Sequence, residues 1–330
     1  MIFAPMEKIE KSNFINNQQS LPEKPGTFSF YQKERLLFIG YSANLRAAVS
    51  AYFVSNPDDR NILQLISLTS DIHYAEKADL FEAFTAAKLL QNQKNTQFNY
   101  LIQPYKDYIY FAVDFHHPPF FKVMENTQDE HYYLGAFENR FLLFDFIDVL
   151  HRLQKLPNCP PDTFPCDLIK TGDCEGYCLK DNPEKVKMIL DNYLFPDGTL
   201  VQELEAKQEQ LMDHLEFIPA EIIRKQLRII RKYYDRLKFM MITKDLNCIL
   251  HSHEVNFQIT GGLVSKMQSD LFTADFPNDK IEMRSNEALA IEKKDLAEAW
   301  LVYRKIKEQQ PELIEKIYQL NREKLRKTLD

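Results

Sequence analysis

The chain has 330 residues, a hydrophobic content of 45%, a charged content of 27% and a formal net charge of −7. A chain of this length can bury two or three separate cores, and its composition is that of an ordinary globular protein. The negative charge argues against a protein that coats nucleic acid along its whole surface, because such binding needs many lysine and arginine contacts to phosphate. The eight glycines are few, which disfavours a fold built on glycine-rich phosphate loops.

The N-terminal segment shows no secretory signal, because acidic and basic side chains appear early in MIFAPMEKIEKSNF. No apolar run approaches the roughly 18–20 residues that span a bilayer. We therefore predict a cytoplasmic protein that does not bind a membrane. Residues 1–24 are polar and weakly patterned, and we interpret them as an N-terminal tail.

Residues 25–115 are predicted to form a small α+β domain. The runs TFSFY and LLFIG, joined by KER, indicate a β-hairpin over residues 27–40. Apolar residues at helical spacing follow in SANLRAAVSAYF, with Ser42 or Asn44 as the N-cap. A second helix is expected over about 75–92, and NYLI and DYIYFAVDF have the composition of strands.

Four of the five cysteines fall between residues 159 and 178, in a connector that we place at residues 116–198. In a chain without a secretory signal, clustered thiols are more often metal ligands than disulfides. Prolines and glycines between them favour turns, which allow several sulfur atoms to approach one point. Four thiolates suit a structural zinc ion or an iron–sulfur cluster, and the spacing leaves that choice open. The predicted ligands are Cys159, Cys166, Cys174 and Cys178.

Residues 199–238 carry two consecutive amphipathic patterns, and Pro219 suits the first turn of the second helix. Two helices joined by a short connection form an antiparallel hairpin, which has too little core to be stable alone. We therefore expect it to pack against another surface, in this chain or on a partner. Seven lysines and arginines between residues 224 and 238 make the second helix basic, which fits a solvated face, an acidic partner or a phosphate contact.

Residues 239–330 are predicted to form a β-hairpin and two C-terminal helices. MMITKD, NCILHS and NFQITGGLVSKM have the composition of strands, and Gly261 and Gly262 suit a hairpin turn. The helices are expected over about 285–309 and 311–328.

The run PGTFSFYQKERLLFIGYSANLRAAVSAYF resembles the start of the GIY-YIG nuclease domain in the form found in UvrC, the incision subunit (excinuclease) of bacterial nucleotide excision repair. HYAEKADLFEAF resembles the stretch that bears the family's metal-binding glutamate, and FNYLI resembles its asparagine motif. The four cysteines fall where UvrC carries its own cluster. QELEAKQEQLMDHLEFIPAEIIRKQLRIIRKY is similar to the UVR motif, the hairpin by which UvrC engages UvrB. The resemblance extends from residue 25 to about residue 265.

Several catalytic positions of the family are changed in this chain. Phe28 and Phe38 replace the two motif tyrosines, and Ala48 replaces the arginine of the first helix. Arg46 lies two residues from Ala48, about 200° round a helix, so it does not take that arginine's place. Phenylalanine has no hydroxyl to orient water, and alanine has no charge to stabilise a departing oxyanion. Because losing one such stabiliser costs about 10²–10³ in rate, we predict a pseudoenzyme with a degenerate nuclease site.

Tyr52 and Asn99 match the family's site residues, and Glu82 matches its glutamate when the alignment starts from His73. Counted back from Asn99 without gaps, the glutamate position falls on Ala87 instead. We prefer Glu82 as the vestigial metal ligand. It would hold Mg²⁺ or Mn²⁺ only if the nuclease is active.

The resemblance implies an iron–sulfur cluster, of the 4Fe–4S type, at the four cysteines, with structural zinc as the alternative. Leu215 and Phe217 stand at the corner of the UVR-like hairpin, which implies contact with a UvrB-like protein. An ordinary intramolecular hairpin is the alternative. The sequence is expected to lack UvrC's second, RNase H-like nuclease domain and its helix-hairpin-helix modules.

The leading functional hypothesis is a UvrC-like repair protein that binds DNA, a UvrB-type partner or both, and makes no incision itself. One alternative is an active, metal-dependent endonuclease that makes a single incision near lesions, with Glu82 and Tyr52 in an altered arrangement. A second alternative is a protein outside repair, in which the cluster has a structural or redox-sensing role.

Overall fold

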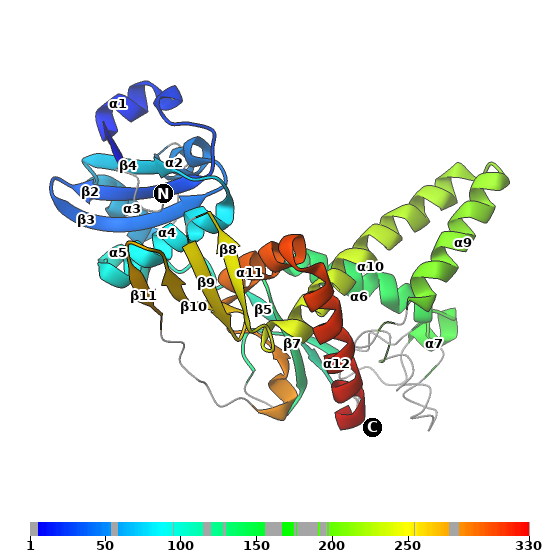
Figure 1. Ribbon diagram of the computed structural model, residues 1–330. Coiled ribbons are helices and arrows are strands. Elements are labelled where there is room, and N and C mark those ends of the chain that lie inside the picture. The colour runs from blue at the N-terminus through cyan, green and yellow to red at the C-terminus, as the bar shows by residue number, and fades with distance from the viewer. Residues whose placement is uncertain are drawn as a thin grey trace. The chain divides into compact units, whose positions relative to one another are not determined.

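The computed structural model describes residues 6–53, 59–94, 96–114, 120–127, 130–155, 167–174, 176, 191, 196, 198–253, 255–276 and 284–329. The chain forms two compact units, each assembled from three separate segments of sequence. Unit 1 contains Met1–Lys106, Asn247–Asn278 and Ala297–Gln309. Unit 2 contains Asp107–Leu246, Asp279–Leu296 and Gln310–Asp330. Helices and mostly antiparallel sheets make up both units, which confirms the predicted α+β class (Figure 1).

The first sheet of unit 1 is antiparallel, with the strand order β1-β4-β2-β3. Strands β2 (Gly26–Gln32) and β3 (Arg35–Ser42) form the predicted hairpin. Strand β4 (Asp71–Glu76) pairs with β2, and β1 (Glu7–Glu10) pairs with β4 at the edge of the sheet.

The segment expected to be a tail is instead part of the core of unit 1. Besides β1 it contains helix α1 (Lys11–Asn16) and the 3₁₀ helix η1 (Gln18–Ser20). Phe14 and Leu21 are fully buried, each with 0% exposure. These two apolar side chains anchor a segment whose polar composition had suggested disorder.

The helices of unit 1 begin with α2 (Leu45–Phe53), which starts after Asn44 as predicted. The Asn44 Oδ1 atom accepts a hydrogen bond from the Ala47 amide at 2.9 Å, as an N-cap does. Helix α3 (Arg60–Leu68) has no predicted counterpart.

Helix α4 (Leu80–Gln93) is shorter than the predicted span of 75–92 at its start, because residues 71–76 pair as β4. Asp79 caps α4 by accepting a hydrogen bond from the Glu82 amide at 2.8 Å. Helix α5 (Gln97–Leu101) occupies the NYLI segment, so the strand predicted there is wrong. Its Phe98 is buried in the core of the unit, which outweighs the segment's strand-like composition.

The second sheet of unit 1 has the order β11-β10-β9-β8. Its strands are β8 (Cys248–Ser252), β9 (Val255–Thr260), β10 (Leu263–Gln268) and β11 (Thr273–Asp275). Gly261 and Gly262 have φ angles of 60° and 78°, so the β9–β10 turn is the left-handed type predicted from the glycine pair.

Helix α4 contacts both sheets of unit 1. It packs on β2 and β3, and its Phe81 ring meets the Phe257 ring of β9 edge-on at 5.1 Å. Helix α11 (Leu296–Gln309) is joined to α4 by an ion pair of 2.5 Å between Glu298 and Lys88. The C-terminal strands and α11 therefore fold onto the N-terminal sheet domain as one unit.

Unit 2 contains a four-stranded sheet with the order β12-β7-β5-β6, which sequence reasoning found only in part. Strand β5 (Ile109–Val113) was predicted, whereas β6 (Phe121–Met124) and β7 (Tyr132–Phe137) fall in the presumed connector. The short β12 (Leu289–Ala290), after the 3₁₀ helix η2 (Ser285–Glu287), pairs with β7 in parallel. Because these residues are η2 and β12, the helix expected from residue 285 begins only with α11.

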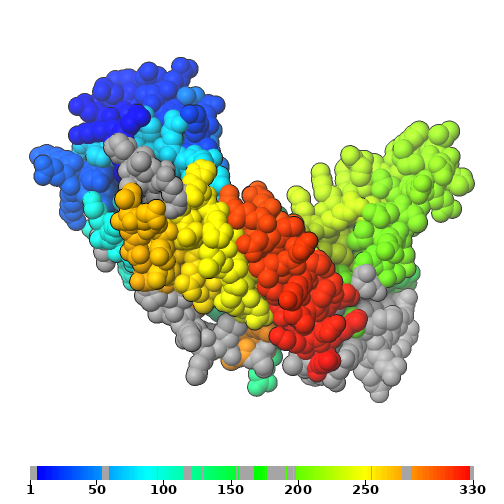
Figure 2. All heavy atoms as spheres, in the orientation of Figure 1, coloured from blue at the N-terminus to red at the C-terminus, as the bar shows by residue number. Residues whose placement is uncertain are grey.

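The helices of unit 2 are α6 (Arg140–Gln154), α7 (Asp167–Thr171), α9 (Thr199–Asp213), α10 (Phe217–Thr243) and α12 (Pro311–Leu329). Helices α9 and α10 form the predicted antiparallel hairpin, and Figure 2 shows its surface in yellow-green. The strand expected at MMITKD is wrong, because the buried residues Met240, Met241 and Ile242 lie in α10. Of the helices in the described part of the chain, none is both long and apolar enough to cross a bilayer.

Candidate functional site

Phe28 and Phe38, which were predicted to stand in place of two motif tyrosines, lie in a packed aromatic cluster on one face of the first sheet. Phe28 on β2 is 2% exposed and Phe38 on β3 is 7% exposed. The ring of Tyr52 on α2 meets both, with centroid distances of 6.1 Å and 5.7 Å. The side chains at 28 and 38 are thus core residues, and they present no hydroxyl to a substrate.

Tyr52 carries a hydroxyl in this cluster, as does Tyr74 of β4, whose hydroxyl donates to the Glu7 carboxylate. Burial raises the pKa of Tyr52 to about 12, so its hydroxyl stays protonated at neutral pH and is a poor base. Ala48, which was predicted to replace an arginine, packs against the same core without a charge. Arg46 lies elsewhere: its Nε donates to the Leu21 carbonyl at 2.8 Å, and its guanidinium pairs with Glu23 at 2.7 Å. These contacts are those of a residue that anchors α2 to the preceding segment, in line with the expectation that Arg46 does not take the place of an arginine at position 48.

Asn99 on α5 is held by the backbone of β3. Its Nδ2 donates to the Ile39 carbonyl at 2.7 Å, and its Oδ1 accepts from the Ile39 amide at 2.8 Å. The Thr96 hydroxyl donates to the same oxygen. Because both ends of the amide are engaged, Asn99 fixes α5 to the edge strand of the sheet.

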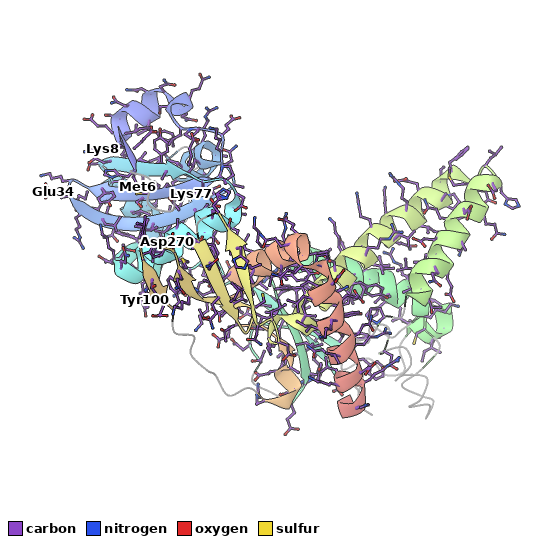
Figure 3. The ribbon with its side chains drawn as sticks, viewed as in Figure 1. Met6, Lys8, Glu34, Lys77, Tyr100 and Asp270 are labelled. Atoms are coloured by element: carbon purple, nitrogen blue, oxygen red, sulfur yellow. The ribbon has the colours of Figure 1, made fainter. Side chains whose placement is uncertain are left out.

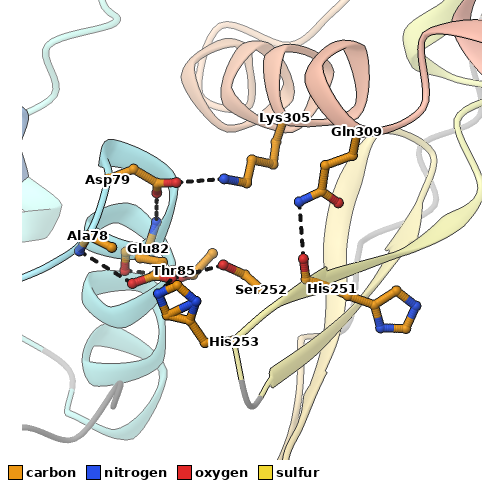
Figure 4. A network of polar contacts seen from close by, with 9 residues as sticks. All are labelled: Ala78, Asp79, Glu82, Thr85, His251, Ser252, His253, Lys305 and Gln309. Carbon is orange, nitrogen blue, oxygen red and sulfur yellow. Dashed lines mark hydrogen bonds and ion pairs between the residues drawn. The ribbon is translucent and has the colours of Figure 1, made fainter.

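Glu82 lies in a polar network that joins α4 to the end of β8 (Figure 4). Its carboxylate accepts a hydrogen bond from the Ser252 hydroxyl at 2.8 Å and lies 3.5 Å from Nε2 of His253. The side chain of Asp79 pairs with Lys305 of α11 at 2.6 Å. Glu82 is 8% exposed, so the carboxylate is largely withdrawn from solvent.

Lys77, which Figure 3 labels, follows β4 and is electrostatically coupled to Glu82. Burial lowers the pKa of the Lys77 ammonium, and the negative charge of Glu82 opposes that lowering. Sequence reasoning missed the partners of Glu82, because Ser252 is 170 positions away and no local pattern links the two.

The two faces of α4 have different neighbours. Phe84 meets the Tyr41 ring of β3 at 5.2 Å, and Gln91 donates to the Ile39 carbonyl at 3.2 Å. Glu82 lies two positions before Phe84, about 200° round the helix, and so on the side that faces the second sheet. Ala87 lies about 40° from Gln91 and is 1% exposed, so it belongs to the side that faces β3.

The structure does not bring Glu82 together with the aromatic cluster. Phe38 and Tyr41 are three positions apart in an extended strand, so their side chains point to opposite faces of the sheet. Tyr41 contacts α4 and Phe38 contacts α2, which places these helices on opposite faces. Glu82 and Tyr52, which the sequence match assigned to one site, therefore have different structural surroundings.

The cysteine site falls mostly outside the described residues, which include Cys174 but not Cys159, Cys166 or Cys178. Cys174 is 4% exposed, and its sulfur accepts a hydrogen bond from the Gly176 amide at 3.2 Å. Such N–H···S bonds also surround the cysteine ligands of metal sites. Within the described residues, no group of three or more histidine, cysteine or acidic side chains is arranged to hold a metal ion.

A cavity of about 380 Å³ lies between α6 and α7, beside Cys174. Its lining includes His151, Asp148, Leu168 and Asp173. The Nε2 atom of His151 is buried and has no hydrogen-bond partner among the residues that the structure describes. Burial lowers the pKa of His151 to about 4, so its imidazole is neutral at physiological pH.

The α9–α10 hairpin packs on α6 at its base and is exposed at its tip. The base is an apolar cluster of Val149, Leu204, Ile223, Leu227 and Ile230. The tip carries exposed apolar side chains, among them Leu215, Phe217 and Ile218, with 72%, 57% and 80% exposure. Leu215 also has a φ angle of 60°, a conformation that costs a leucine about 1 kcal/mol or more.

Comparison with known proteins shows similarity to UvrC. The chain is 25% identical to UvrABC system protein C of Symbiobacterium thermophilum over 82% of this chain and 45% of that protein. It is 27% identical to the protein of the same name from Lactobacillus acidophilus, over 68% of this chain and 39% of the relative. The chain thus spans less than half the length of these curated relatives. No family model matches the sequence.

Among solved structures, the chain is similar to the GIY-YIG N-terminal endonuclease domain of UvrC from Thermotoga maritima, bound to its catalytic magnesium ion. The identity is 20%, the match covers 27% of this chain and 98% of that domain, and the TM-score is 0.25. A TM-score this low supports no further argument. The sequence similarity confirms the predicted resemblance of this chain to UvrC proteins.

Proposed function

We propose that this chain is a UvrC-like nucleotide excision repair protein that acts by binding and makes no incision of its own. Its partners would be DNA, a UvrB-type protein or both. The similarity to UvrC proteins supports the repair role. The aromatic cluster carries the proposal, because Phe28 and Phe38 have no hydroxyl and Tyr52 keeps its proton. Hydrolysis of a phosphodiester needs a group that orients or deprotonates water; the phenylalanines can do neither, and Tyr52 is a poor base at neutral pH.

The carboxylate of the nuclease site would also be missing. Ala87 lies on the side of α4 that faces β3, and the gapless count from Asn99 assigns the family's glutamate to this position. Glu82 would then stabilise the contact with β8, and Mg²⁺ or Mn²⁺ would have no carboxylate ligand beside the sheet.

The hairpin tip would be the site for a UvrB-like partner. The apolar side chains of Leu215 and Phe217 are exposed at the tip, and neither stabilises the packed base. A leucine held in the left-handed conformation at an exposed position is costly for the free chain, and burial on a partner would offset that cost.

The four cysteines would hold an iron–sulfur cluster, and a structural zinc ion is the alternative. The buried sulfur of Cys174, with its N–H donor from Gly176, suits a thiolate ligand of either. When bound, such a group would cross-link the segment between α6 and the hairpin. Its chemistry in this chain would be structural, and no catalytic step depends on it.

Capture of purified UvrB by this chain tests the hairpin's role. We expect Phe217→Ala to weaken capture by at least tenfold, and Phe141→Ala to leave it unchanged. Phe141 is a matched control, because it is an aromatic residue of unit 2 with 73% exposure at the start of α6. Equal capture by both variants and the parent chain would remove the hairpin from the proposal.

Binding of a fluorescent DNA duplex, with and without a lesion, tests the proposed DNA binding. An iron-containing preparation that binds neither DNA nor UvrB would favour a structural or redox role outside repair. Nicking of the duplex would favour the active endonuclease.

A further inference from the structure

The α9–α10 hairpin carries unpaired charges of opposite sign on its two helices. On α9, Glu209 and Asp213 are exposed and form no ion pair within the described part of the chain. On α10, Arg228 and Lys232 are exposed, and they too form no ion pair among the described residues. Neighbouring charges are paired inside the hairpin: Arg231 with Glu205, and Arg224 with Glu221.

The unpaired acids and bases have the same spacing. Each pair is separated by four positions, which is about 6 Å along a helix and about 40° round it. Glu209 and Asp213 lie on the side of α9 opposite the buried Leu204. Arg228 and Lys232 lie on the side of α10 opposite Ile223, Leu227 and Ile230. Both charged stripes therefore point away from the packed interior of the hairpin.

The distances of these charges from the tip are complementary. At about 1.5 Å per residue, Asp213 is the last residue of α9 and Glu209 lies about 6 Å before it. Arg228 and Lys232 lie about 17 and 23 Å after the start of α10. If two hairpins overlap with their tips pointing in opposite directions, one register places Arg228 beside Glu209 of the other copy and Lys232 beside Asp213. A two-fold axis then repeats both contacts.

We propose that two copies of this chain associate through their hairpins. In each copy the basic stripe of α10, Arg228 and Lys232, lies against the acidic stripe of α9, Glu209 and Asp213, of the other copy. Ile218, with 80% exposure, lies about 40° from Lys232 round α10 and becomes covered in the pair. A surface that is acidic on one helix and basic on the next fits a second copy of itself, because each stripe finds its complement in one symmetric contact. The inference stands apart from the repair role.

Exposed ion pairs are individually weak and are screened by salt, so the association is expected to be weak and salt-sensitive. Light scattering coupled to size exclusion, run on the full chain over a concentration series, measures it. We expect the mass to rise towards twice that of one chain at low salt and to fall back in concentrated NaCl. A mass of one chain at every concentration and salt level would overturn the proposal.

Charge reversal separates this contact from misfolding and from a nonspecific contact. We expect two double variants to stay monomeric, because like charges then meet. They are Glu209→Lys/Asp213→Lys and Arg228→Glu/Lys232→Glu. An equal mixture of the two variants is expected to recover the doubled mass, since each stripe again faces its opposite. Lys316→Glu, an exposed change on α12, is the control and leaves the association unchanged. Failure of the mixture to associate, or doubled mass in either variant alone, would refute the pairing.

Discussion

The ring of Phe28 lies directly against the backbone of Gly40, so that a Cβ built on Gly40 would come 2.3 Å from the Cζ atom of Phe28. Non-bonded carbon atoms do not approach this closely. Gly40 is therefore needed here to make room for the ring of Phe28.

Gly40→Ala is expected to destabilise the protein by about 1–3 kcal/mol, because the added methyl group forces the Phe28 ring or its strand to move. Urea unfolding of the two forms measures this. In a Phe28→Leu background, which removes Cζ, the same change is expected to cost clearly less. An equal cost in both backgrounds would show that the ring is not what restricts position 40.

Asn99→Ala is expected to lower the free energy of unfolding by about 1–3 kcal/mol, because it leaves the Ile39 amide without its side-chain partner and the Ile39 carbonyl with only the longer bond from Gln91. Asn92→Ala is the matched control, since Asn92 is exposed and makes only a 3.5 Å hydrogen bond, to the Asp275 carbonyl. If the two variants unfold at the same urea concentration, Asn99 does not anchor α5 to β3.

The sequence predicts the β2–β3 hairpin, α2, the β9–β10 turn and the α9–α10 hairpin correctly, because turn residues and apolar periodicity specify each of them locally. It does not predict that Phe14 and Leu21 are buried, since a short polar segment reveals nothing of the sheet that covers it. The surroundings of Glu82 are equally hidden. Ser252 and His253 reach it through the packing of distant strands, which no local pattern encodes.

Acid is expected to destabilise unit 2 through His151. Its pKa is lowered from 6.5 to about 4 in the folded chain, so its contribution to stability is complete above pH 6.5. Between pH 6.5 and 4 the unfolded chain binds a proton that the folded chain does not, and stability falls by about 3 kcal/mol at most. His151→Gln is expected to flatten this slope, whereas exposed His214→Gln keeps it. Urea midpoints from pH 7 to 4 test this, and identical slopes in all three proteins would contradict it.

Leu215→Gly is expected to raise the free energy of unfolding by about 0.5–1 kcal/mol, because glycine adopts a φ angle of 60° without strain. The same change removes an exposed apolar side chain from the hairpin tip and is expected to weaken capture of UvrB. Thermal unfolding and capture are measured on one preparation. A variant that is more stable but captures UvrB as well as the parent would show that Leu215 does not contribute to partner binding.

The most direct test of the central claim is strand cleavage of a lesion-bearing duplex in Mg²⁺ or Mn²⁺, with this chain alone and together with UvrA and UvrB. Glu82→Ala and a preparation from cells with empty vector run beside it. We predict no nicking above the empty-vector level under any of these conditions, although the chain binds the duplex or UvrB. Nicking by the parent chain that disappears in Glu82→Ala would show that the nuclease is active and that Glu82 belongs to its site.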